Sequence, residues 1–150
     1  MNLPDDRVAL DWLILADGAQ VVGGKLYLLG GGWDVLTVNS GFPVQQHLAI
    51  AAAFRVPWTQ TNQKHSVEIR LLNDDSQEVL ATIAGEFEVG RPPGIPPGSA
   101  QRSQLAAQLV VGFAQPGQYG IRCAIGGEEQ VTNQVSFRVV AGPLGRSSGT

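Results

Sequence analysis

The sequence predicts an all-β protein that folds as an antiparallel β-sandwich of about eight or nine strands. Apolar residues recur at every second position along 48–56, 79–89 and 105–113, which is the period of a strand with one buried face. Nineteen glycines and nine prolines among 150 residues supply many short connections. No stretch carries the period of a long helix, and many short strands are typical of two packed antiparallel sheets.

Length and composition indicate one domain. A chain of 150 residues buries about 68–70% of its unfolded surface on folding. Its hydrophobic fraction of 43% is that of an ordinary globular protein. We expect the sandwich to span 8–141, after a loose lead-in over 1–7 and before a flexible tail over 142–150.

Charge and cysteine content narrow the range of partners and compartments. The net charge is −3 and the ten basic residues are scattered, which predicts neither a nucleic-acid partner nor a membrane partner. The single cysteine, Cys123, excludes an internal disulfide. No apolar run approaches the roughly 20 residues of a membrane span, and the acidic start does not resemble a secretory signal. These features predict a cytoplasmic protein.

The first part of the chain predicts a meander of short strands. A strand over 10–16 has apolar residues on both faces, so we expect both faces to be covered. Short apolar runs over 19–22 and 25–29 follow, and 33–38 continues them. Glycine adopts backbone conformations that other residues resist, so we expect chain reversals at three clusters: Asp17-Gly18, Gly23-Gly24 and Gly30-Gly31-Gly32.

The clearest strand covers 46–56. Its perfect alternation and the proline that follows it favour a strand over the helix that alanines alone would favour. The face expected toward solvent carries three residues that we call the alanine strip: Ala49, Ala51 and Ala53. An exposed strand normally carries charge instead, so we expect the strip to be covered. The cover is either the proline-rich segment 91–98 or, as the favoured alternative, a second copy of the protein, which predicts a homo-oligomer.

The second half of the chain predicts further strands and tight turns. A hairpin over 67–71 and 79–89 is joined by a polar turn at 73–76, whose Asn, Asp and Ser side chains bond their own backbone. The segment 91–98, RPPGIPPG, should break the sheet and run extended in polyproline II-like geometry. Three more strands are expected, with turns at Pro116-Gly117 and Gly126-Gly127 between them: 105–113, 119–125 and 135–139.

Several motifs resemble catalytic or metal sites, but a structural role accounts for each more simply. The run from Gly18 to Lys25 lacks the spacing and the Ser or Thr of a phosphate-binding loop, so a hairpin turn is favoured. His47 and His65 have no Cys, His or carboxylate at ligand spacing. Cys123 lies on an apolar row, which favours inert burial over reactivity.

Two sets of acidic residues have both a functional and a structural explanation. Glu86 and Glu88 lie about 6.6 Å apart on one face of a strand. Glycosidase carboxylates lie at comparable distances, but a solvated face is favoured. Four aspartates have the oxygen ligands that calcium prefers, although turn chemistry explains each of them: Asp17, Asp34, Asp74 and Asp75. We therefore expect no enzyme activity, no cofactor and no metal.

The loop around Trp58 is a better functional candidate. An aromatic ring beside amide and hydroxyl groups is suited to contact with a sugar or a peptide, and loops on rigid sandwiches often carry function. The competing structural explanation, which we favour, is that Trp58 closes the end of the sandwich. The candidate residues for contact with a ligand or partner are Trp58, Thr61, Asn62, His65 and Arg91.

A family resemblance covers most of the chain. Three strings carry it: LADGAQVVGGKLYLLGGGWD, VPWTQTN with His65 following, and EFEVGRPPGIPPG. Together they resemble a bacterial protein family known only as a domain of unknown function, over roughly 13–140, which implies no activity, cofactor or catalytic residue. The segment PGQYGIRCAIGGEEQVTNQVSFRVV is similar to the closing hairpin of immunoglobulin-like or fibronectin-like domains. That similarity implies an immunoglobulin-like sandwich but no function.

Two functional hypotheses follow from these features. The first is a non-catalytic interaction or structural module that self-associates in the bacterial cytoplasm. The alternative is a module that binds a small ligand or a carbohydrate through Trp58, Thr61, Asn62 and His65.

Overall fold

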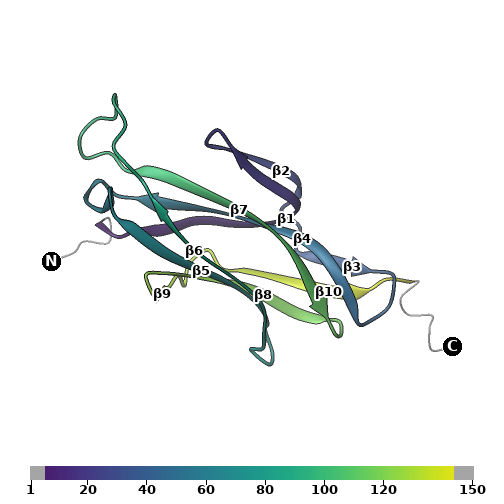
Figure 1. The fold of residues 1–150 in the computed structure, drawn as a ribbon. Coiled ribbons are helices and arrows are strands. Elements are labelled where there is room, and N and C mark those ends of the chain that lie inside the picture. Colours follow the sequence, from purple (N-terminus) through teal and green to yellow (C-terminus); the bar gives the residue numbers. More distant parts are fainter. Residues whose placement is uncertain (1–5, 144–150) are drawn as a thin grey trace.

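The computed structural model describes residues 6–143 as two β-sheets packed face to face (Figure 1). Strands make up 64% of the described residues, which confirms the predicted all-β class. Most of the expected lead-in and tail, 1–5 and 144–150, lies outside the described residues. No helix among the described residues is long and apolar enough to cross a membrane.

The first sheet has four strands in the order β2-β1-β4-β7, and all of its neighbouring strands are antiparallel. The strands are β1 (Ala9–Val22), β2 (Lys25–Gly31), β4 (Val44–Val56) and β7 (Gln101–Phe113). Between β4 and β5 the chain makes one short 3-10 turn, η2 (Trp58–Gln60).

The second sheet has the order β3-β10-β8-β5-β6, with β9 paired to β8. Its β10 and β3 run parallel, and its other strand pairs are antiparallel. The strands are β3 (Val35–Val38), β5 (Lys64–Asn73), β6 (Val79–Glu88), β8 (Gly117–Ile125), β9 (Glu128–Glu129) and β10 (Val135–Ala141).

Aromatic and branched aliphatic side chains from both sheets form the core between them. Phe113 of the first sheet meets Tyr119 of the second edge to face, with ring centroids 4.9 Å apart. The Tyr119 hydroxyl donates to the Gln115 carbonyl at 2.8 Å, across the turn that joins β7 to β8. A tyrosine tied to backbone just upstream also occurs in immunoglobulin-like sandwiches, and the topology is consistent with that fold.

The predicted meander is correct at Gly23-Gly24 and wrong on either side of it. Strand β1 runs through Asp17-Gly18 without a reversal, and Gly18 lies opposite Leu29 as an ordinary strand residue. The reversal comes at Gly23 and Gly24, with φ of 59° and 74°, which joins β1 to β2 as a two-residue hairpin. The segment after Gly32 does not continue the meander, because β3 crosses to the second sheet and pairs with β10.

The alanine strip is covered, as expected, but by neither of the two expected covers, the proline-rich segment and a second copy. Ala49, Ala51 and Ala53 are each 0% exposed, although they lie on the outer face of the first sheet. The cover comes from the same chain: the β1–β2 hairpin folds back over this face. Leu26 and Leu28 pack there against four buried alanines that we call the alanine cluster: Ala16, Ala19, Ala49 and Ala51. The hairpin turn reaches β7, where Gln104 Nε2 donates to the Gly24 carbonyl at 2.9 Å.

The proline-rich segment 91–98 breaks the sheet as predicted, but it does not run as an extended polyproline II segment. Two tight turns follow each other, closed by bonds from Ile95 N to Pro92 O at 3.4 Å and from Ser99 N to Pro96 O at 3.2 Å. Gly94 and Gly98 have φ of 92° and 84°, which is the third position of a type II turn after proline. The repeated Pro-Pro-Gly sequence therefore encodes two successive turns, and it does not contribute to the cover of the alanine strip.

Candidate functional site

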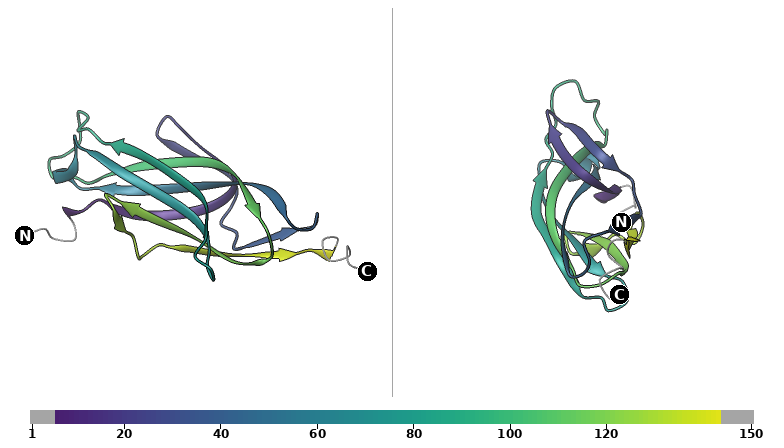
Figure 2. Two further views of the ribbon diagram at one scale, coloured as in Figure 1. Left: turned by 60° about the horizontal axis from the view of Figure 1, so that its bottom comes forward. Right: turned by 90° about the vertical axis from the view of Figure 1, so that its right-hand side faces the viewer.

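Contacts bring the five residues predicted around Trp58 together where η2 meets the proline-rich loop. Figure 2 shows the loop after β4 and the loop after β6 side by side at one end of the sandwich. The Arg91 guanidinium lies over the Trp58 ring, with Cζ 4.0 Å from the ring centroid. Arg91 Nε donates to Thr61 Oγ1 at 2.7 Å, and Arg91 Nη2 donates to the Trp58 carbonyl at 2.9 Å. The Thr61 hydroxyl in turn donates to the same carbonyl at 2.7 Å.

Asn62 and His65 fix the strand that leaves this turn. Asn62 has a φ of 59°, and its backbone N–H donates to the Val89 carbonyl at 2.7 Å. His65 Nε2 lies 2.8 Å from the Gln60 carbonyl, and because a carbonyl can only accept, this nitrogen carries the proton. The imidazole ring also lies 5.5 Å from the ring of Phe87.

The polar groups of this cluster bind one another. Thr61 is 4% exposed and both accepts and donates a hydrogen bond within the cluster. Arg91 covers one face of the Trp58 ring in a cation–π contact. These hydrogen bonds join η2 to the loop that follows β6 at this end of the sandwich. A role of these residues in ligand binding stays a prediction.

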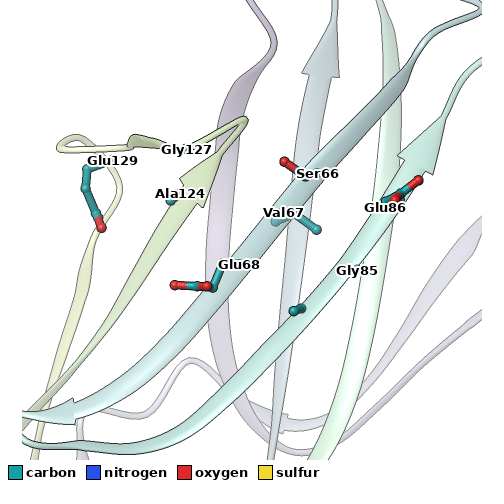
Figure 3. A pocket seen from close by; sticks show the side chains of 9 residues that line it. Ser66, Val67, Glu68, Gly85, Glu86, Ala124, Gly127 and Glu129 are labelled. Atoms are coloured by element: carbon teal, nitrogen blue, oxygen red, sulfur yellow. The ribbon is translucent and has the colours of Figure 1, made fainter.

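A separate hollow lies on the outer face of the second sheet (Figure 3). It is an open groove of about 610 Å³ whose floor is made of small residues. Glu68, Glu86 and Glu129 stand on three different strands around it. Arg70 forms ion pairs with Glu68, at 3.5 Å, and with Glu129.

The two carboxylates that were compared with a glycosidase pair, Glu86 and Glu88, do not both line this groove. Glu86 lines it, whereas Glu88 lies farther along β6, opposite Lys64. Within residues 6–143, no group of three or more His, Cys, Asp or Glu side chains is placed to hold a metal ion.

Cys123 is buried, as the sequence predicted. It is 1% exposed, and this burial raises the pKa of its thiol to about 11, with the nearby Glu129 carboxylate adding to the rise. Arg70 opposes the shift. The thiol is therefore protonated near neutral pH and is a poor nucleophile.

The polar turn after β5 shows the chemistry expected from its side chains. Asn73 Oδ1 accepts from the backbone N–H groups of Asp75 and Ser76 at 2.9 and 3.0 Å. Asp74 pairs with Arg122 at 2.8 Å. The Asp74 carboxylate therefore has a structural partner in this turn.

Sequence reasoning missed an apolar surface on the β1–β2 hairpin. Tyr27 and Leu29 are 56% and 74% exposed, and we call these two residues the hairpin patch. They line a shallow pocket of about 370 Å³ together with Gln20 and Gln108. The signal was present in Leu26 to Leu29, where four consecutive apolar residues give the strand two apolar faces.

Comparison with known proteins gives a family and a fold. The chain belongs to DUF6941, a family of unknown function whose model matches residues 11–140. This confirms the predicted membership of a family without an assigned activity. No curated protein matches the sequence significantly.

Two solved structures resemble this fold over 89% of the chain. One is the alkylpurine DNA glycosylase AlkC of Pseudomonas fluorescens bound to DNA with an abasic-site analogue, at 11% identity and a TM-score of 0.50. The other is a β-glucosidase from Listeria innocua in complex with gluconolactone, at 8% identity and a TM-score of 0.44. The matched regions cover 30% and 16% of those chains. Likeness at such low identity concerns the fold alone.

Proposed function

We propose that this family member is a non-catalytic protein-interaction module that self-associates through its β1–β2 hairpin. The observation that carries the proposal is the hairpin patch, because Tyr27 and Leu29 leave more than half of their surface in water. Adjacent exposed apolar side chains of this size are typical of a protein–protein contact.

The hairpin is also held in place before any partner binds. Leu26 and Leu28 are packed against the alanine cluster on one side, and Gln104 ties the turn to β7. Binding to a surface that is already ordered loses little conformational entropy. A rigid patch of an aromatic and an aliphatic side chain is therefore well suited to association.

The non-catalytic part of the proposal rests on the groups that could react. The Cys123 thiol is buried, and the His65 ring is bonded to backbone. Glu86 and Glu88 do not share a groove. The expected cytoplasmic location belongs to the same proposal, and cell fractionation with an antibody against the protein tests it.

Carbohydrate binding at Trp58 is the weaker alternative. A sugar stacked on the face that Arg91 covers would have to displace Arg91, which bonds both Thr61 and the Trp58 carbonyl. Retention of the protein on immobilised glycans, lost in Trp58→Ala, would favour this alternative.

Sedimentation velocity over a micromolar concentration series tests the proposal. We expect a species heavier than the 15.9 kDa chain that shifts to the monomer in Tyr27→Ser/Leu29→Ser. Val79→Ser serves as the control, because Val79 is 46% exposed on the other sheet and should leave the mass unchanged. A wild-type protein that stays monomeric throughout the series would overturn the proposal.

A further inference from the structure

We infer that self-association pairs β2 with β2 of a second copy, antiparallel, about a two-fold axis at Leu28. This inference rests on the proposed function and specifies its contact surface. The order of the first sheet, β2-β1-β4-β7, leaves β2 with a strand on one side only. The other side presents backbone N–H and C=O groups, which another strand can satisfy.

Strand β2 lacks the features that normally keep an edge from pairing. It has no proline, and its one charged residue, Lys25, lies at its end. The other sheet edges described here differ: β3 has four residues, and β6 and β7 lie against each other where the two sheets meet. Gly30 has a φ of 57°, but β2 continues past it to Gly31, which pairs with Ala16 in the same register.

The register follows from the two faces of the strand. Directly opposed residues of an antiparallel pair point to the same face, so a two-fold axis must pass through one residue of β2. An axis at Leu28 uses the whole strand, because Lys25 and Gly31 are equally distant from it. It places Tyr27 opposite Leu29 of the partner subunit, an aromatic–aliphatic pair of the kind that stabilises sheets. The same pair recurs on the other side of the axis, so the most exposed side chains of the strand are buried together.

The charges at the two ends of β2 are complementary in this register. Lys25 lies at one end, and at the other the Asp17 carboxylate occupies the space that a side chain at Gly30 would need. Among the described residues, neither Lys25 nor Asp17 forms an ion pair. Antiparallel pairing sets Lys25 opposite Gly31 of the partner subunit, twice, at the end of β2 near which Asp17 of the partner subunit lies. Parallel pairing would instead set each lysine beside the other.

The resulting assembly is closed. Both copies use the same edge, and the contact occupies it in each of them. No further copy can add at this edge, so association stops at a dimer and does not extend into a fibre. The two first sheets become one continuous sheet, with the two β2 strands at its centre.

Disulfide trapping tests the inference at the level of single residues. We expect Tyr27→Cys mixed with Leu29→Cys to form a mixed disulfide dimer under mild oxidation, whereas each variant alone should crosslink at least tenfold less. Both side chains are exposed, so the variants should keep the wild-type circular dichroism spectrum. Buried Cys123 should stay unmodified, and Val79→Cys controls for random collision.

The outcomes separate this inference from the proposed function. Efficient crosslinking of Tyr27→Cys with itself would show another register and overturn the inference. A dimer by sedimentation with no trapping at either position would place the contact elsewhere, so that the inference fails while self-association stands. A monomer by sedimentation with no trapping would overturn both.

Discussion

The outer faces of the two sheets carry opposite kinds of side chain. On the first sheet the central strand β4 presents the alanine strip, and every residue of it is fully buried. On the second sheet the inner strand β5 presents Glu68 and Arg70, beside the open groove. The first face is covered by a hairpin of its own sheet, and the second is open to water.

This difference explains why the outer face of the first sheet carries alanines where polar residues would be expected. A hairpin can lie close to a sheet only where the side chains beneath it are small, and alanine leaves that space. A row of alanines on an outward face therefore indicates that another segment of the chain covers it. The hairpin covers the apolar surface of the alanines, but it exposes apolar surface of its own, because Tyr27 and Leu29 lie on its outer side.

The largest expected effect comes from a charge placed beneath the hairpin. Ala51→Glu buries a carboxylate among alanines and leucines, so we expect a loss of roughly 3 kcal/mol or more in the free energy of unfolding. Urea denaturation followed by circular dichroism measures it. The matched control is Thr82→Glu, exposed on the second sheet opposite Arg70, for which we expect a change within about 0.5 kcal/mol. Equal stability of the two variants would show that the hairpin does not cover β4.

A smaller effect separates the two sides of the hairpin itself. Leu28→Ala removes an aliphatic side chain that packs on the alanine cluster, and we expect a loss of about 2 kcal/mol, the low end for leucine because Leu28 is only partly buried. Leu29→Ala truncates its neighbour, which is 74% exposed, and should change stability by at most about 0.5 kcal/mol. Stability of dilute, monomeric samples should be compared so that association does not contribute. A larger loss for Leu29→Ala than for Leu28→Ala would contradict the assignment of the two faces.

The smallest effect concerns Cys123, which lies under the second sheet. Burial raises the pKa of its thiol to about 11, above its ordinary value of 9.0. Above pH 9 the unfolded chain therefore loses this proton before the folded protein does, so the thiol's contribution to stability falls as pH rises from 9 to 11. At neutral pH we expect a thiol reagent to label Cys123 only after denaturation. Rapid labelling of the native protein would show that the core of the second sheet is open to water.

Much of the fold could be predicted from the sequence because strand periodicity is a local property. The strand expected over 46–56 is β4 (Val44–Val56), and the hairpin of β5 and β6 forms around its polar turn as expected. Gly18 was misassigned because a glycine in a strand and a glycine in a turn look the same in sequence. The crossing of β3 could not be predicted either, since its partner β10 lies far away along the chain.

The candidate site shows the same limit. Residue types correctly drew attention to Trp58 and Arg91, which lie in different loops. Arg91 stacks on the Trp58 ring because the segment after β6 lies beside η2. No local sequence pattern predicts how these two segments lie relative to each other. The hairpin patch was missed because exposure of Tyr27 and Leu29 depends on what lies on each side of an edge strand.

The two proline turns over 91–98 have a consequence for how the chain assembles. They join β6 of the second sheet to β7 of the first, so this segment must bring two layers together before the core can form. Prolines restrict the unfolded chain, and turns that form locally reduce the number of conformations that the connection must give up. The connection between the two sheets therefore loses less conformational entropy on folding than a flexible loop of the same length would. Its turns also direct β7 toward β4 before the two strands pair.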